Sequence, residues 1–168
     1  MTTGDVLRLD PATGALVERI TSSRDISQGP EVMWIAVGEG GVWTASQSGR
    51  VAFVDSRTNR VTRAEEVSDA LDGITVGEGA VWAINALEDS ILRIDPATAR
   101  VTGSPVRVGR APTAAAAGAG AVWVTSERDG TLTRIDPATS DIETIDVGGA
   151  ATDVAVGRGA VWVTVDVR

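Results

Sequence analysis

Residues 76–85 read VGEGAVWAIN, and residues 91–102, a few positions on, read ILRIDPATARVT. Both segments recur along the chain. The first returns as VGEGGVWTAS (37–46), AGAGAVWVTS (117–126) and VGRGAVWVTV (156–165), and the second as VLRLDPATGALV (6–17), VAFVDSRTNRVT (51–62) and LTRIDPATSDIE (132–143). The tryptophans of the first motif lie 39, 41 and 39 residues apart. Two alternating motifs therefore divide the whole chain into units of about 40 residues.

A unit of this length has room for four short strands, which we name a, b, c and d. In the copy that contains VGEGAVWAIN they are expected at 74–76, 81–84, 91–95 and 100–108. Glycines supply the tight turn between a and b, and Asp-Pro-Ala-Thr sets the turn between c and d. Apolar residues run consecutively, as in AVWVT, which favours strands covered on both faces. We predict an all-β β-propeller of about four four-stranded antiparallel blades; the shorter coils of a β-solenoid fit the period less well.

The motifs predict one domain, 1–168, that begins on strand c and stops on strand b. Its units are a half blade (1–31), three blades (32–70, 71–111, 112–150) and a second half blade (151–168). Three arrangements fit this division. The half blades join into a split blade that closes the ring and hides the sheet edges, the chain is a fragment of a larger propeller, or open chains pair into an eight-bladed dimer.

The repeated VGxGAVW and RIDPAT segments resemble the YVTN/YncE-like propeller repeats of bacteria, and more distantly NHL-repeat and virginiamycin B lyase-like propellers. The resemblance covers nearly the whole chain. It implies a blade-forming scaffold, of the kind found alone or fused to signalling proteins as a sensor or interaction domain. It also implies a fused domain or further blades as alternatives to a free-standing protein.

Composition excludes several classes of function. The formal charge is −8, all 15 basic residues are arginine, and histidine and cysteine are absent. Nucleic acid is not an expected partner, because phosphate binding needs a clustered basic surface. The lack of cysteine excludes disulfides, thiolate metal sites and cysteine nucleophiles. We expect no cofactor.

No apolar run is long enough to span a membrane, and the first residues, MTTGDVLRLD, lack the features of a signal peptide. As written, the sequence predicts a cytoplasmic protein. A fragment of a larger receptor-like protein would instead be extracytoplasmic.

Several recurring residues are predicted to be structural. The tryptophans occupy one position of the unit and are expected between blades: Trp43, Trp82, Trp123 and Trp162. The aspartates that open the c–d turn are expected to hold that turn: Asp10, Asp95 and Asp136. The arginines two residues earlier, Arg8, Arg93 and Arg134, are expected to pair with carboxylates at the blade edge.

The b–c and d–a loops, unlike the a–b and c–d turns, differ in every unit. In a propeller the b–c and d–a loops share one face, and loops on a rigid scaffold often carry function. We predict binding of a protein or small-molecule ligand there, over residues 21–31, 46–49, 66–73, 85–90, 109–114, 126–130 and 148–153. The face is acidic and favours a cation or a basic partner. Its candidate residues are Arg24, Asp25, Glu31, Asp69, Asp72, Asn85, Glu88, Asp89, Arg110, Glu127, Arg128, Asp129 and Asp153.

An enzyme is the alternative. Lactonase- or lyase-like propellers hold a metal, and here Asn85, Glu88 and Asp89 are the group that comes nearest to such a site. Without histidine, general-base chemistry would need a carboxylate with a raised pKa. The sequence contains no nucleophile motif, so a non-catalytic scaffold is the favoured interpretation.

Overall fold

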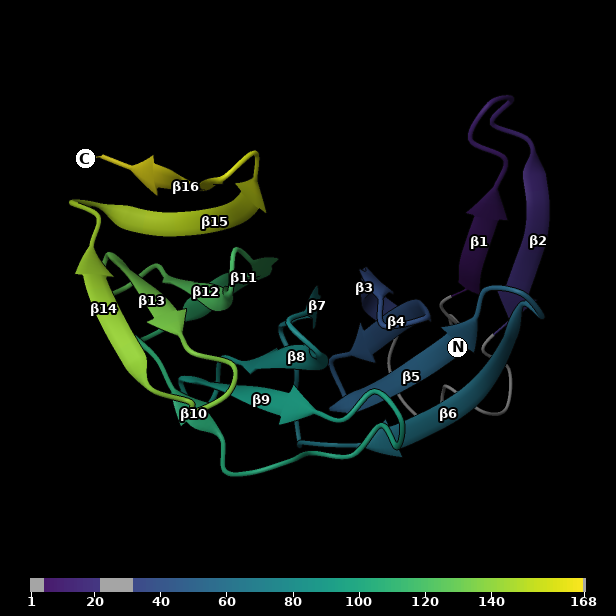
Figure 1. Cartoon of the computed structure of the whole chain (residues 1–168), viewed down its shortest axis with the longest axis horizontal. Helices are drawn as coiled ribbons and strands as arrows, with labels where there is room; N and C mark the ends of the chain where they lie inside the picture. The colour runs from purple at the N-terminus through teal and green to yellow at the C-terminus, as the bar shows by residue number, and fades with distance from the viewer. Residues whose placement is uncertain (1–4, 22–31, 168) are drawn as a thin grey trace.

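The computed structural model describes residues 5–21 and 32–167, and within them it contains sixteen strands and no helix (Figure 1). In chain order the strands are β1 (Asp5–Leu9), β2 (Leu16–Thr21), β3 (Val32–Gly38), β4 (Gly41–Ser46), β5 (Arg50–Asp55), β6 (Arg60–Glu66), β7 (Gly73–Gly77), β8 (Ala80–Asn85), β9 (Ser90–Ile94), β10 (Val106–Arg107), β11 (Pro112–Gly118), β12 (Ala121–Ser126), β13 (Thr131–Ile135), β14 (Ile142–Asp146), β15 (Ala150–Gly157) and β16 (Ala160–Asp166). None of the described residues belongs to a helix long and apolar enough to cross a membrane.

Consecutive strands pair antiparallel into three complete sheets and two hairpins. Sheet I is β3–β6, sheet II is β7–β10 and sheet III is β11–β14; β1 and β2 form the N-terminal hairpin, and β15 and β16 the C-terminal hairpin. Each sheet carries strands a to d in order, so the predicted all-β architecture of four-stranded antiparallel blades is confirmed. Strands a (β3, β7, β11) line the inside of an arc, and strands d (β6, β10, β14) its outside (Figure 1).

The two hairpins stand at opposite ends of this arc (Figure 1) and form separate two-stranded sheets. The N-terminal hairpin supplies strands c and d, and the C-terminal hairpin supplies strands a and b. The split blade that would close one chain on itself is therefore not present among the described residues. The two ends of the arc stand apart instead (Figure 1).

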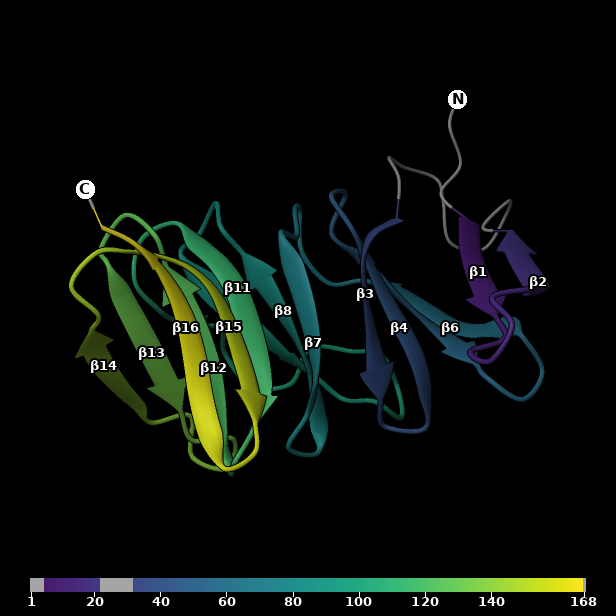
Figure 2. The same cartoon turned by 90° about the horizontal axis from the view of Figure 1, so that it is seen from above.

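The recurring turns lie along one edge of the sheets, the lower edge in Figure 2. In the a–b turn after β7, Gly79 takes a φ of +75°, which glycine adopts without steric cost. In the c–d turn after β1, Asp10 accepts hydrogen bonds from the backbone N–H groups of Ala12 at 2.9 Å and Thr13 at 2.8 Å. Asp55, Asp95 and Asp136 hold their turns with the same kind of bond.

The core lies between the sheets. We name the face of a sheet that looks toward the next sheet along the chain its forward face, and the opposite one its backward face. The forward face of sheet I packs against the backward face of sheet II, through Trp43, Ala45, Val51 and Phe53 on one side and Val81, Ala83, Leu92 and Ile94 on the other. The forward face of sheet II packs in the same way on sheet III, through Trp82, Ile84 and Ile91 against Val122, Val124 and Ile135.

Each motif tryptophan on strand b of a complete sheet carries a guanidinium over its ring. Arg93 lies 5.9 Å from the ring centroid of Trp82, and Arg134 lies 5.9 Å from that of Trp123. These arginines were expected to pair with carboxylates, and that expectation is wrong, since neither has a carboxylate partner among the described ion pairs. The directly opposed positions of strands b and c bring Trp and Arg together instead. A desolvated cation–π contact stabilises by up to about 2 kcal/mol.

Sheet I reaches the same arrangement by another route. Its strand c has Phe53 where the other sheets have arginine, and the Phe53 and Trp43 ring centroids are 5.0 Å apart. Arg63 of strand d covers both rings, at 3.9 Å from the Phe53 centroid and 5.9 Å from the Trp43 centroid.

Burial of the tryptophans increases with the number of sheets that cover them. Trp43 and Trp82 are fully buried, Trp123 is half-buried under the C-terminal hairpin, and Trp162 is 65% exposed. Within the described chain Trp162 is therefore not between blades, in contrast to the other three, because no described strand packs on the forward face of the last hairpin. Strand d of sheet II also differs from the expected 100–108. It is reduced to Val106–Arg107 and one isolated bridge between Ile94 and Val101.

Truncation of a fully covered tryptophan should be costly. We expect Trp82→Ala to lower the free energy of unfolding by about 3–5 kcal/mol, because it opens a cavity between sheets II and III. Leu87→Ala, at a loop side chain that is 79% exposed, should change it by less than about 0.5 kcal/mol. Urea unfolding followed by circular dichroism, at one protein concentration for all variants, measures both. Equal midpoints for the two variants would contradict the packing described here.

Candidate functional site

The b–c and d–a loops lie together on the edge of the sheets opposite the glycine turns (Figure 2). We call this surface the variable face. Its described loops are 47–49, 67–72, 86–89, 108–111, 127–130 and 147–149. The described binding residues predicted from the sequence lie in these loops or, for Asn85, at the strand end beside one, except Asp153, which lies within β15. Arg24, Asp25 and Glu31 lie outside the described residues.

One backbone hydrogen bond recurs beneath the variable sequences. The N–H of Val67 donates to Gly49 O at 2.9 Å, that of Val108 to Asp89 O at 3.0 Å, and that of Val147 to Gly130 O at 3.0 Å. In each sheet this bond ties the start of the d–a loop to the end of the b–c loop. The loops therefore differ in side chains while their bases keep one conformation.

Several candidate carboxylates are already engaged by loop N–H groups. Asp72 accepts from the backbone N–H of Ala86 at 2.9 Å, and Asp89 accepts from that of Ala111 at 2.9 Å. The Asp89 bond joins the b–c loop of sheet II to the segment that enters sheet III. These two carboxylates order the face, and that use competes with ligand binding.

Asp129 is held most firmly. Its carboxylate accepts from the backbone N–H of Arg110 at 2.8 Å and from the Arg110 Nε at 2.7 Å. The backbone bond, followed by the guanidinium bond, holds the pKa of the Asp129 carboxyl below its usual value. The group is ionised at neutral pH. It cross-links the loop that leads from sheet II into sheet III with the b–c loop of sheet III.

Asn85 does not belong to an open site. It is 3% exposed, its Nδ2 donates to Ser68 Oγ at 2.8 Å, and its Oδ1 accepts from the Glu88 N–H at 3.1 Å. The oxygen of the amide closes the b–c turn, and its nitrogen ties that turn to the d–a loop before sheet II. Among residues 5–21 and 32–167 no three acidic, histidine or cysteine side chains gather as a metal site would require. In this geometry both ends of the Asn85 amide are bonded within the protein, so the amide is not free to coordinate a metal beside Glu88 and Asp89.

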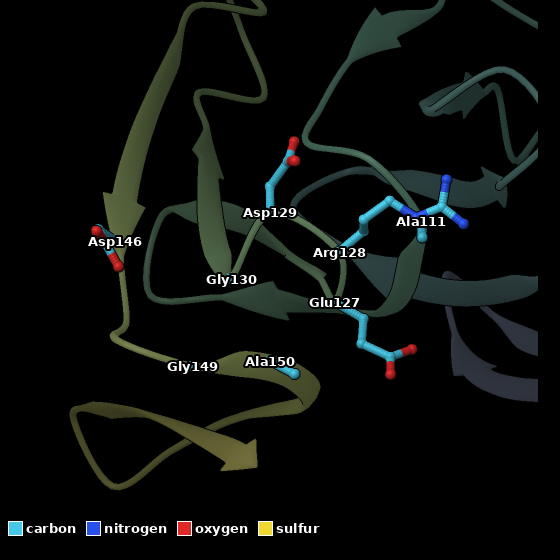
Figure 3. A pocket seen from close by; sticks show the side chains of 8 residues that line it. All are labelled: Ala111, Glu127, Arg128, Asp129, Gly130, Asp146, Gly149 and Ala150. Atoms are coloured by element: carbon cyan, nitrogen blue, oxygen red, sulfur yellow. The ribbon is translucent and has the colours of Figure 1, made fainter. Parts of the chain in front are cut away.

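A hollow of about 570 Å³ opens on the variable face beside sheet III. It is lined by Ala111, Glu127, Arg128, Asp129, Gly130, Asp146, Gly149 and Ala150 (Figure 3). Glu127, Arg128 and Asp129 project from the b–c loop, between Ala111 on one side and the start of β15 on the other (Figure 3). The structure thus brings together three predicted residues from one loop and the paired Arg110 next to them.

Asp146 was missed by the sequence interpretation because it ends strand β14. The loop after this strand is so short that the last residue of the strand reaches the face, and this brevity, GG at 148–149, was the available signal. The Asp146 carboxylate accepts from the Gly148 N–H at 2.8 Å. Two other predicted residues, Asp69 and Asp153, are exposed but do not line the hollow.

The opposite face offers turns rather than a site. The pKa values of Asp10, Asp55 and Asp136 are lowered, first of all by backbone N–H groups of their own turns. Their spacing places them one per blade, and each carboxylate is turned back on its own backbone. The aspartate array is a set of turn-forming residues.

No protein-family model and no curated protein matches this chain by sequence. Solved structures match it well in shape. It is similar to the β-propeller domain of Cps50 (Swd1) from Myceliophteria thermophila, with 15% identity and a TM-score of 0.78 over 96% of this chain and 56% of that one. BamB from Moraxella catarrhalis matches with 19% identity and a TM-score of 0.73 over 96% and 50%. Virginiamycin B lyase from Staphylococcus aureus matches with 17% identity and a TM-score of 0.73 over 96% and 56%.

These likenesses establish the propeller fold, and at such low identity they establish the fold alone. The chain spans about half the length of the solved structures it matches. Its blades therefore superpose on an arc of a ring rather than on a whole ring.

The bond between Arg110 and Asp129 predicts a measurable pH dependence. A carboxyl whose pKa is lowered in the folded state contributes stability above its ordinary pKa and loses it as the pH falls through the folded pKa. In a carbon-detected NMR titration, Asp129 should titrate below an ordinary aspartate, and Arg110→Gln should raise its pKa. Arg128→Gln, which removes a charge without a hydrogen bond, should raise it less. An unchanged Asp129 pKa in Arg110→Gln would contradict the assignment.

Proposed function

We propose that this chain is a non-catalytic β-propeller scaffold that binds a protein or small-molecule ligand at the hollow of its variable face. The observation that supports the proposal is the hollow itself. Three neighbouring charged side chains of one loop line it, and its volume is about 570 Å³. This volume falls within the range of ligand sites. Asp72, Asn85 and Asp89, on the other loops, are tied into the loop backbone.

The chemistry of the lining indicates the class of ligand. Ligand pockets for apolar molecules are mostly hydrophobic, whereas four of the eight residues here are charged. Asp129 is neutralised by Arg110, and Glu127, which is exposed, has no ion-pair partner among the described residues. The remaining charged side chains are the carboxylates of Glu127 and Asp146 and the guanidinium of Arg128, so the lining carries a net negative charge. A basic group, such as an arginine or lysine side chain of a partner protein, is therefore favoured.

The resemblance of the repeats to YVTN/YncE-like bacterial propellers supports the same proposal at the level of family. Such repeats act as sensor or interaction modules, and the ordered loop bases found here suit a rigid recognition surface. A scaffold of this kind needs no catalytic group. The enzyme alternative would need a metal site or an activated base in this hollow.

The proposed ligand class can be tested with a labelled octa-arginine peptide, and with octa-glutamate as the reversed charge. Binding of octa-arginine, followed by fluorescence anisotropy, should weaken by up to about fivefold in Glu127→Gln, as expected for an exposed ion pair. Glu39→Gln removes the same charge from an exposed turn on the opposite face and should leave the affinity unchanged. Equal losses in both variants would show that the peptide follows net charge only, and the hollow would lose its role.

A metal titration separates the scaffold from the enzyme. We expect calcium, magnesium and zinc to give weak, unsaturable heats that fade with added salt, because exposed charges are screened. Glu88→Ala should leave these heats unchanged, and a panel of lactones should not be turned over. A single tight site that is lost in Glu88→Ala, with lactone hydrolysis by the unmodified protein, would defeat the non-catalytic proposal.

A further inference from the structure

The two hairpins are complementary halves of one blade. In each complete sheet strand b pairs with strand c: β4 with β5, β8 with β9, and β12 with β13. Strand b of the C-terminal hairpin, β16, has no strand c within the described chain, and strand c of the N-terminal hairpin, β1, has no strand b. Each half therefore exposes the backbone edge that the other half would pair with, and such edges invite association.

The repeat fixes how these edges would meet. In sheet II Trp82 lies opposite Arg93, and Ala83 lies opposite Leu92. Sheet III repeats this register, with Trp123 opposite Arg134. Transferred to the hairpins, the register places Trp162 opposite Arg8 and Val163 opposite Leu7. The pairing would be antiparallel, as in every complete sheet.

Trp162 and Arg8 occupy the positions of a stacked tryptophan–arginine pair, but within one chain they are not paired with each other. Trp162 is 65% exposed, and no guanidinium lies over it among the described residues. Arg8 is exposed and donates from Nη1 to Ser56 O at 2.7 Å and to Asn59 Oδ1 at 2.9 Å. A guanidinium keeps such in-plane hydrogen bonds while an aromatic ring stacks on its face. The face of Arg8 is thus available for the ring of Trp162.

The inner strands are complementary in the same way. A Cβ at Gly38 would lie 2.7 Å from Val76 Cγ1, and a Cβ at Gly118 would lie 3.0 Å from Val156 Cγ1, so each glycine marks the contact with the next inner strand. At the last position of the series, Gly157, such a Cβ would meet no atom within 4 Å. The matching side chain at the other end of the arc is Val37, which is 76% exposed.

Among the described residues, seven of the twelve large exposed apolar side chains lie on these two end faces. Leu7, Leu9 and Leu16 lie on the N-terminal hairpin, Met33, Ile35 and Val37 on β3, and Trp162 on β16. The corresponding residues of sheet II, Leu92, Ile94, Ile74 and Val76, all pack against the forward face of sheet I. The corresponding residues are buried between blades elsewhere in this chain, so the exposed apolar patch indicates an interface with another blade.

The size of the arc suits a second copy as the occupant. The chain matches 50–56% of the length of the solved Cps50, BamB and virginiamycin B lyase chains, so two such arcs have together about the length of one of those chains. The two hairpins of one chain stand at opposite ends of the arc (Figure 1). A second copy carries both complementary halves in the required order, and a two-fold axis makes the two junctions identical.

We propose that two copies of this chain close one propeller ring, with β16 of each copy paired to β1 of the other and Trp162 of each stacked on Arg8 of the other. Each junction completes a four-stranded blade. Its forward face is then covered by β3 of the second copy, which buries Ile35 and Val37.

Size-exclusion chromatography with light scattering tests the assembly. The unmodified protein should run at twice the mass of one chain. Trp162→Glu and, from the other side of the junction, Val37→Glu should each give folded monomers, with strand content checked by circular dichroism. Leu87→Glu, at an equally exposed apolar residue of the variable face, should leave the dimer intact. A monomeric unmodified protein would overturn the proposal, as would a dimer that both junction variants leave unchanged.

Cysteine pairs test the partner and the register, since the chain has no cysteine of its own. Directly opposed residues of antiparallel strands lie about 4.5–5.5 Å apart between Cα atoms, within disulfide range. The double variant Leu7→Cys with Val163→Cys should oxidise to a covalent dimer. A mixture of the two single variants should also give one, which only pairing between chains allows. A disulfide within a single chain would show closure of one chain on itself, and higher covalent oligomers would show an open filament; both results would overturn the two-copy ring.

Discussion

Every sheet of this protein is apolar on both faces and has to be covered twice. The forward face presents tryptophan and its neighbours, and the backward face presents valine, leucine and isoleucine, so one sheet supplies what the previous sheet needs. Burial of apolar area is the main favourable term in folding, and here it is available only when sheets stack in order. The glycine at the end of strands β3, β7 and β11 belongs to the same constraint, because a side chain there would meet the next inner strand.

The same constraint gives the two edges of the arc different roles. Glycine and aspartate turns repeat on one edge because they set the geometry of each blade. On the other edge the loop bases share one backbone hydrogen bond, and beyond it the side chains differ from sheet to sheet. Charged side chains collect beside sheet III, where a short loop brings the end of β14 up to the b–c loop (Figure 3). Asp129 and Asp146 there hold loop N–H groups, and binding is proposed because Glu127 has no ion-pair partner among the described residues.

The sequence was sufficient for the architecture because two local signals are each repeated four times: the tryptophan motif and the turn after strand c, which reads DPAT in three copies and DSRT in one. It was not sufficient for the partners of Arg93 and Arg134, since a cross-strand contact with tryptophan depends on register, which strand lengths alone do not determine. It also misjudged Trp162, whose exposure depends on whether another sheet packs against the last hairpin. At the candidate site it identified the loop of Glu127 and Arg128. It could not show that the Asn85 amide bonds its own turn and the neighbouring loop, and it missed Asp146, which loop length moves onto the face.

The central claim is that the forward face of one sheet and the backward face of the next stabilise each other. A double-mutant cycle between Trp82→Ala and Val122→Ala, two fully buried residues that share the cluster between sheets II and III, tests it directly. The account predicts a coupling free energy of about 0.5–3 kcal/mol, as for residues in one packed cluster. The matched cycle pairs Trp82→Ala with Val54→Ala, an equally buried valine on the backward face of sheet I, and should be additive within about 0.5 kcal/mol. Additive effects in the first cycle, or equal coupling in both, would contradict the account.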